Sequence, residues 1–240
     1  MTYYTAFAAS ESLRCLNESF VAELAASPSR ALAPDIVRLL ELFSDECMDA
    51  YFLNPVEMID LNPMGKKVVL GGVAAIKKTI KLALKKVLGK LPNNELVPLA
   101  DYIDSMLLKP QEGSDLPTYI AVVLPDELHQ RITEVVSNGR DTEPHLVVKE
   151  FSIALCDLVD VAIESYFERP IEMMKLGYLS EKIARLANDA VSSGAKTVIK
   201  KVTKTMRNEE LLAFFGFAES IVVDGPAKEA EVGISVHSAG

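Results

Sequence analysis

Lysines in two stretches of the chain are the residues whose type and spacing come closest to forming a binding site. Residues 64–90 contain eight lysines and no acidic residue, although the whole chain has a formal net charge of −9. At helical spacing several of them share one side of a helix. Such a row could bind an anionic lipid, a phosphate group or a nucleic acid. The candidate anion- or partner-binding residues are Lys67, Lys78, Lys81, Lys85, Lys86, Lys182, Lys196, Lys200 and Lys201.

These lysines also have a simpler interpretation. Residues 1–60 hold ten acidic and three basic residues, so the lysines could pair with acidic helices of the same chain or face solvent. We favour this interpretation because the rest of the chain is so acidic. Residues 64–90 taken alone are similar to a cationic amphipathic peptide on a membrane. Their wide apolar arc is more typical of a central core helix, and Asn188 and Asp189 of the second stretch would weaken insertion.

No pattern in the chain predicts catalysis, a cofactor or a metal. Carboxylates recur at equivalent places, but a di-metal site on helices also needs Glu-x-x-His, and no histidine follows a glutamate by three positions. Glu57 and Glu172 are better explained by the start of a helix, where the dipole favours negative charge. Nucleophile motifs, Gly-rich phosphate loops and Cys/His clusters are absent from the sequence. We therefore expect no catalytic, cofactor-binding or metal-binding residues.

The elements that must position these residues occur twice. The stretch YFLNPVEM, Tyr51–Met58, returns as YFERPIEM, Tyr166–Met173. Around it residues 40–108 align with residues 155–223 without an insertion, with 18 identities in 69 positions. Helical periodicity in both copies predicts an all-α fold of two homologous helical-bundle repeats related by a pseudo-twofold axis. The predicted ranges are 1–112 for the first repeat, 116–223 for the second and 224–240 for a disordered, flexible C-terminal tail.

The repeated stretch itself predicts a joint between two elements. Its aromatic pairs, Tyr51-Phe52 and Tyr166-Phe167, are expected to close a helix against the core, and stacking on a ligand is the alternative role. Asn54 then suits the cap of a new short helix and Pro55 its first position. The stretch therefore marks a corner of the fold.

Two further local patterns carry expectations. Gly71-Gly72, inside a long predicted helix, indicates a close helix crossing or a bend. The apolar runs 121–124 and 221–223 are short and isolated, so we predict no sheet.

Composition places the chain among soluble, intracellular proteins. About half of its residues are apolar and a quarter are charged. The N-terminus lacks a signal-peptide pattern, and no stretch is long and apolar enough to predict a transmembrane helix. Cys15, Cys47 and Cys156 form no motif, which is typical of buried free thiols in a reducing cytoplasm.

Three functional hypotheses follow, in order of preference. The first is a non-enzymatic protein that binds another macromolecule, most simply a protein partner, through exposed helical surfaces. The second is a protein that binds anionic lipid or nucleic acid through the lysine rows. The third is an enzyme with a site in a cleft between the repeats. The sequence predicts no particular oligomeric state.

Overall fold

The computed structural model of the chain describes residues 2–109 and 117–225, and within these ranges the fold is mostly helical. It also contains a small antiparallel sheet, so the prediction of an all-α fold is wrong in that respect. The part of the predicted tail beyond residue 225 lies outside the described residues. Within them, no helix is long and apolar enough to cross a membrane.

The helices occur in the same order in the two halves of the chain. The first half contains α1 (Glu11–Ala25), α2 (Ala33–Met48), η1 (Asp49–Leu53), α3 (Asn54–Met58), α4 (Pro63–Leu88) and α5 (Asn93–Ser105). The second half contains α6 (Asp126–Asp141), η2 (Pro144–Val147), α7 (Val148–Ile163), η3 (Glu164–Glu168), α8 (Arg169–Met173), α9 (Tyr178–Thr203) and α10 (Asn208–Ser220). From α2 onward, each helix of the first half has a counterpart of equal length 115 residues later.

The sheet joins the two halves. Its strands are β1 (Thr2–Ala8), β2 (Leu107–Leu108), β3 (Tyr119–Val123) and β4 (Val222–Gly225), in the spatial order β2-β3-β1-β4. The central pair, β1 and β3, places Ala6 opposite Ala121, and these residues are also 115 positions apart. β1 pairs with β3 and β4, which both lie far away in the sequence, and this explains why short local patterns did not predict a sheet.

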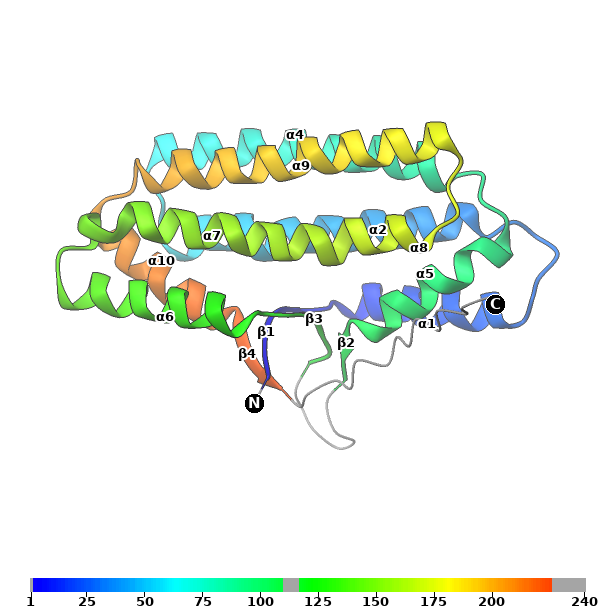
Figure 1. Cartoon of the computed structure of the whole chain (residues 1–240), viewed down its shortest axis with the longest axis horizontal. Helices are drawn as coiled ribbons and strands as arrows, with labels where there is room; N and C mark the ends of the chain where they lie inside the picture. The colour runs from blue at the N-terminus through cyan, green and yellow to red at the C-terminus, as the bar shows by residue number, and fades with distance from the viewer. Residues whose placement is uncertain (1, 110–116, 226–240) are drawn as a thin grey trace, which may run out of the picture.

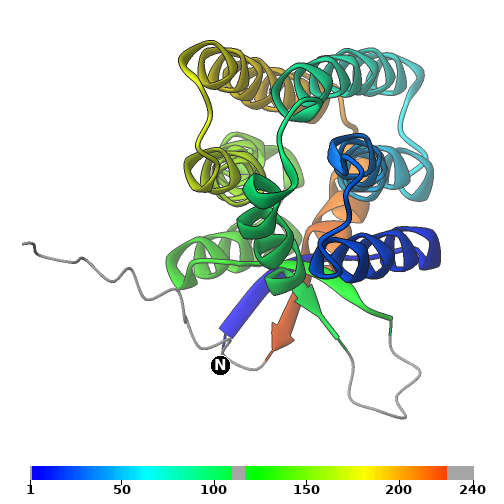
Figure 2. The ribbon, with the colours of Figure 1, turned by 90° about the vertical axis from the view of Figure 1, so that its right-hand side faces the viewer.

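The molecule is layered (Figures 1 and 2). The long helices α4 and α9 lie side by side in the outermost layer, and α2 and α7 lie beneath them. The helices α1 and α6 flank the next layer, α5 and α10 cross it, and the sheet closes the far side. A Cβ at Gly72 would collide with Val198, so the glycine allows α4 and α9 to cross closely. This bears out the expected close crossing.

The repeated stretch begins in a π-helical turn, which the sequence did not predict, and continues into a short α-helix. The helix α2 runs on through η1 into α3, and α7 runs on through η3 into α8. Asn54 is the first residue of α3, and Leu53, in the cap position, makes no side-chain capping bond. The prediction of Asn54 as a cap is therefore wrong: the wider turn carries the chain past Pro55 without a break.

One hydrophobic core runs through both halves, with residues of α2, α4, α7 and α9 at its centre. Each half packs against the other: α5 contacts α8, and α10 contacts α3. Cys47 and Cys156 are buried free thiols, as expected, whereas Cys15 is exposed.

Candidate functional site: a pair of apolar cavities and a row of lysines

The nine predicted lysines divide into two groups. Three form ion pairs with acidic residues of the layer beneath, namely Lys81 with Asp45 (2.9 Å), Lys85 with Glu41 (3.6 Å) and Lys196 with Asp160. The hydrogen bond from Lys81 to Asp45 raises the pKa of this lysine. Lys77, which was not among the nine, also lies 2.7 Å from Asp49. Part of the lysine row therefore holds the outer layer of helices to the layer beneath.

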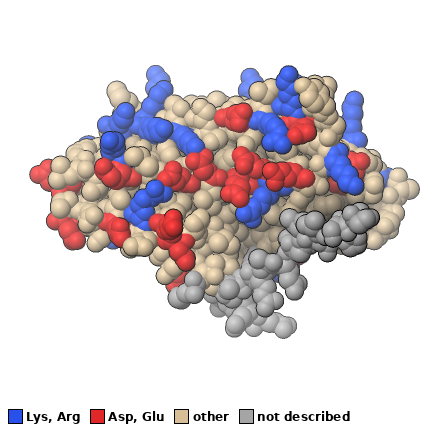
Figure 3. All heavy atoms as spheres, in the orientation of Figure 1, with Lys and Arg blue, Asp and Glu red and all other residues tan. Residues whose placement is uncertain are grey.

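The second group is exposed on the outer layer. Its members have no ion pair among the described residues, and they are Lys67, Lys78, Lys86, Lys182, Lys200 and Lys201. Figure 3 shows Lys and Arg side chains along the upper edge of the molecule, where α4 and α9 lie, and many Asp and Glu side chains in the band below. Binding of an anion by these six lysines stays a prediction.

The buried carboxylate of Glu210 has a structural role. Its Oε1 accepts a hydrogen bond of 2.7 Å from the backbone N–H of Asn62, and its Oε2 one of 2.7 Å from the backbone N–H of Arg207. Burial alone would raise the pKa of Glu210, but these hydrogen bonds and that of the Asn62 side chain outweigh it, and the pKa is lowered. The described part of the chain contains no group of three or more His, Cys, Asp or Glu side chains that could hold a metal ion.

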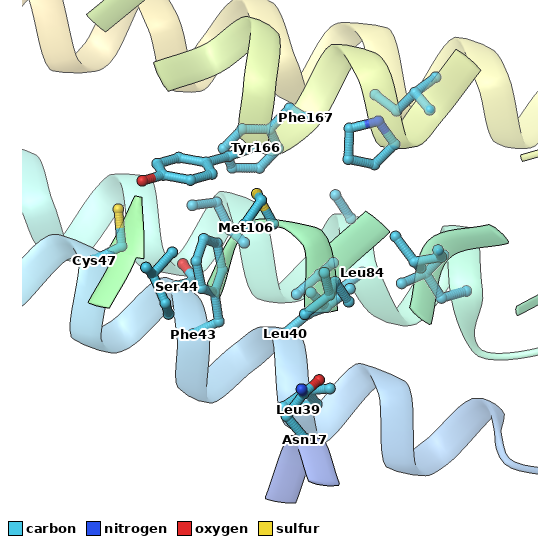
Figure 4. A pocket seen from close by; sticks show the side chains of 18 of the residues that line it. Asn17, Leu39, Leu40, Phe43, Ser44, Cys47, Leu84, Met106, Tyr166 and Phe167 are labelled. Carbon is cyan, nitrogen blue, oxygen red and sulfur yellow. The ribbon is translucent and has the colours of Figure 1, made fainter. Parts of the chain in front are cut away.

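An apolar cavity of about 110 Å³ lies in the core of the first half (Figure 4). Helices of both halves supply its walls. Among the lining residues are Leu40 and Phe43 of α2, Leu84 of α4, Leu99 of α5, Phe167 of η3 and Ala184 of α9. Protein interiors leave few voids larger than a water molecule, so this space is a candidate site for an apolar ligand.

A second apolar cavity of about 110 Å³ occupies the equivalent place in the second half. Its lining includes Leu155, Leu158, Ile199 and Phe214, which stand 115 positions after Leu40, Phe43, Leu84 and Leu99 of the first cavity. The two cavities lie at equivalent places among helices that recur at the same spacing. They therefore follow from the arrangement of the helices and not from one local defect in packing.

The two cavities adjoin in the middle of the molecule. Both are lined by Cys47, Met48, Tyr166, Phe167 and Val191. Burial raises the pKa of Cys47 to about 12 and that of Tyr166 well above its usual value, so both groups are neutral at physiological pH. The shared wall is therefore apolar in character and uncharged.

Away from this shared wall, the first cavity is lined by polar atoms that lack a hydrogen-bond partner, whereas the hydroxyls of Thr5 and Tyr51 in the second lie within hydrogen-bonding distance of each other. The Oδ1 of Asn17 and the Oγ of Ser44 are buried and have no hydrogen-bond partner among the described residues. Arg14, one helical turn before Asn17, is exposed and also lines the cavity, which therefore reaches the surface there. Figure 4 shows Asn17 on the opposite side of the cavity from Tyr166. The cavity thus has one polar end.

A third buried polar group, the hydroxyl of Tyr166, lies at the shared wall near the hydroxyl of Tyr51, which contributes to its raised pKa. The Tyr51 hydroxyl lies 3.2 Å from Thr5 Oγ1, within hydrogen-bonding distance. Its counterpart, the hydroxyl of Tyr166, has no partner at normal hydrogen-bond geometry within the described residues, because Ile120 stands where Thr5 would be. A buried polar group without a partner costs roughly 1–3 kcal/mol, so such groups call for a ligand or a bound water.

The π-helical turns place the aromatic pairs at the cavities. Tyr51 and Phe52 of η1 line the second cavity, whereas Tyr166 and Phe167 of η3 line both. Single π-helical turns inside α-helices occur often at functional sites. The repeated YF-x-x-P motif was thus the sequence signal that could have located this site.

The sequence gave no comparable signal for Asn17 and Ser44. Each is one polar residue on the apolar side of an amphipathic helix, and it becomes informative only when its lack of a partner is known.

No protein-family model, curated protein or solved structure matches this chain.

Proposed function

We propose that this protein is a non-enzymatic carrier or sensor of a slender amphiphile, a molecule with one apolar chain and one polar end. The observation that carries the proposal is the pair of adjoining apolar cavities with unpaired polar atoms at one end. An apolar cavity of roughly 150 Å³ holds a whole benzene molecule. Each cavity of about 110 Å³ is smaller, so it suits a short segment of a slender hydrocarbon chain rather than a ring.

The shape of the space favours a chain over a rigid ring system. The cavities meet at a wall made of only five residues, including Met48 and Tyr166. A flexible chain could cross this wall where side chains move aside, and the unbranched Met48 side chain can adjust its conformation to let the chain pass. The chain would lie in the second cavity and cross the wall, with its polar end in the first.

The polar end would meet Arg14, Asn17 and Ser44. Asn17 and Ser44 offer an amide and a hydroxyl, and Arg14 offers a guanidinium at the opening. A carboxylate can accept hydrogen bonds from the Ser44 hydroxyl and the Asn17 amide N–H, and it carries the charge opposite to that of Arg14. The unpaired Oδ1 of Asn17 is itself an acceptor, so its partner would be a donor such as a bound water. A fatty acid is therefore the ligand class that we propose.

Titration of delipidated protein with the apolar dye ANS, followed by displacement with oleate, tests this function. Ala184→Leu narrows the first cavity and Ala195→Leu the second, since each residue is buried and lines one of them. We expect each variant to bind oleate at least about ten-fold more weakly, a loss of about 1.4 kcal/mol. The matched control is Ala213→Leu, on the exposed side of α10, which should bind like the unaltered protein.

The polar end has a separate test. Arg14→Gln should weaken binding of oleate about ten-fold and leave binding of oleyl alcohol unchanged, because only the carboxylate loses an ionic partner. If neither oleate nor ANS binds, or if Ala213→Leu weakens binding as much as the cavity variants do, the proposed function is wrong. Thermal melting of each variant shows whether it is folded.

The proposal extends to the origin and location of the protein. We infer that the two halves arose by duplication and are related by a pseudo-twofold axis through the β1–β3 pair, an inference supported by the equal spacing of helices, strands and cavities. We keep the cytoplasm as the proposed location, since two of three cysteines are buried free thiols.

Binding to another macromolecule through exposed helices, the function that the sequence favours, is the second candidate. The specific observation in its favour is the exposed row of six lysines on the outer layer.

A further inference from the structure

The outward face of the α4–α9 layer has an unusual charge for this acidic protein. α4 contains seven lysines and no acidic residue, and α9 contains five cationic and two acidic residues. One of the two acids, Glu181, is paired with Arg185 of the same helix. After the ion pairs to the layer beneath are formed, six lysines remain exposed without an ion pair among the described residues. The remaining faces carry the acidic excess, so the charges give the molecule a preferred orientation toward an anionic surface.

Large apolar side chains lie among these lysines. Met64 and Leu82 of α4 and Leu179 and Leu186 of α9 have exposed fractions between 53% and 69%. At 100° per residue, they lie on the side of each helix opposite to its buried residues, as Lys78 and Lys182 do. The two rows of apolar side chains flank a shallow groove between α4 and α9 that is lined mainly by small residues. Exposed apolar residues gathered on one basic face mark an interaction surface.

We propose that the outer face of α4 and α9 docks on the surface of an anionic lipid bilayer. The lysines would lie among the headgroups, and the leucines and Met64 would enter the boundary with the acyl chains. Each basic residue near an anionic membrane adds to the attraction, so six lysines on one face favour reversible binding. A nucleic acid would use the lysines alone and gain nothing from the exposed leucines, so a membrane fits this face better.

Sedimentation with vesicles tests the docking. Delipidated protein should bind vesicles of phosphatidylcholine mixed with phosphatidylserine, bind vesicles of phosphatidylcholine alone weakly, and lose affinity as salt is raised. Lys78→Glu with Lys182→Glu should reduce binding to the mixed vesicles at least about ten-fold. The control with the same change in charge is Arg38→Glu with Lys149→Glu, two exposed residues of α2 and α7, and it should bind at least about three-fold more tightly than the first pair.

The apolar side chains distinguish a membrane from a nucleic acid. Leu82→Ser with Leu186→Ser leaves every charge in place and should weaken vesicle binding about five-fold or more. Leu146→Ser with Ile153→Ser, two exposed residues outside the α4–α9 layer, should have no effect.

Three results would overturn the proposal: equal binding to both kinds of vesicle, equal binding by Lys78→Glu/Lys182→Glu and its control, or binding of duplex DNA without binding of vesicles. The cavity variant Ala184→Leu should still bind vesicles, so failure of the amphiphile function and failure of membrane docking can be told apart.

Discussion

The two cavities have the same architecture and different chemistry. Each lies between a π-helical turn and a long helix, and their lining residues correspond at a spacing of 115. Yet Ser44 in the wall of the first cavity corresponds to Val159 in the second, and Asn17 corresponds to Ile132. The first cavity therefore has unpaired polar atoms at its outer end, and the second is apolar at the matching place.

This difference shows that the fold does not require polar residues at these two places. A scaffold of this kind can be closed with apolar residues at both places, as the second half demonstrates with Val159 and Ile132. Buried polar atoms without partners lower stability, so Asn17 and Ser44 are costly additions to a fold that works without them. Some positions hold a destabilising polar residue in one half and an apolar residue in the other. Such positions are candidates for a functional role.

The largest expected effect concerns a pair of glutamates. Glu210 is buried and accepts hydrogen bonds from two backbone N–H groups, whereas its counterpart Glu95 is partly exposed and has no hydrogen bond or ion pair among the described residues. Glu210→Ala should lower the free energy of unfolding by roughly 3 kcal/mol, because it removes a buried carboxylate that accepts hydrogen bonds from two part-buried backbone N–H groups. Glu95→Ala should lower it by less than about 0.5 kcal/mol. Urea denaturation of both variants measures the difference, and equal losses would contradict it.

The same glutamate predicts a dependence on pH. The pKa of Glu210 in the folded protein is lower than its ordinary value of 4.5. The ionised carboxylate therefore stabilises the fold above pH 4.5, and this contribution is lost as the pH falls through the lower pKa of the folded state. We expect the stability advantage of the unaltered protein over Glu210→Gln to shrink steadily below pH 4.5 in urea denaturation. An advantage that grows on acidification would contradict the lowered pKa.

The next effect concerns the polar end of the first cavity. Ser44→Val copies the residue of the second half and removes an unpaired hydroxyl, so it should raise the free energy of unfolding of the ligand-free protein by about 1 kcal/mol. The reciprocal change, Val159→Ser, should lower it by about 1–2 kcal/mol. In the same urea titrations Ser44→Val should also weaken the stabilisation that oleate gives. Destabilisation by Ser44→Val would show that the hydroxyl has a partner in solution.

The sequence was sufficient to predict the helices and their recurrence, but not how the two halves meet. Periodicity located the long helices because each has one continuous apolar side. Gly71-Gly72 predicted a close crossing or a bend, and Gly72 lies at a close crossing. The sheet depends on pairing such as Ala6 with Ala121, and β propensity follows from such contacts rather than from the local sequence.

The candidate site was harder to predict for a related reason. Lysines are visible as a charged pattern, but the division into ion-paired Lys81 and exposed Lys78 depends on where α2 lies. A cavity forms where side chains from several helices do not fill the space between them, so no single stretch of sequence predicts it. The motif at Tyr51 and Tyr166 predicted a joint in the core, with ligand stacking as the alternative, and a joint and a cavity wall look the same in sequence.

The smallest expected effect on the free energy of unfolding concerns two equivalent tyrosines, whose hydroxyl groups have different surroundings in the two halves. Tyr51 lies at hydrogen-bonding distance from Thr5, whereas Tyr166 has no partner at normal geometry within the described residues. Tyr51→Phe should therefore cost about 1 kcal/mol, the net contribution of one hydrogen bond, and Tyr166→Phe should be neutral or stabilising by a similar amount. Thr5→Val, which removes the other side of the bond, should make Tyr51→Phe nearly neutral in a double-mutant cycle. Tyr166→Phe could also weaken oleate binding while the protein stays folded. That result would show that the Tyr166 hydroxyl contacts the ligand and is not only part of the wall between the cavities.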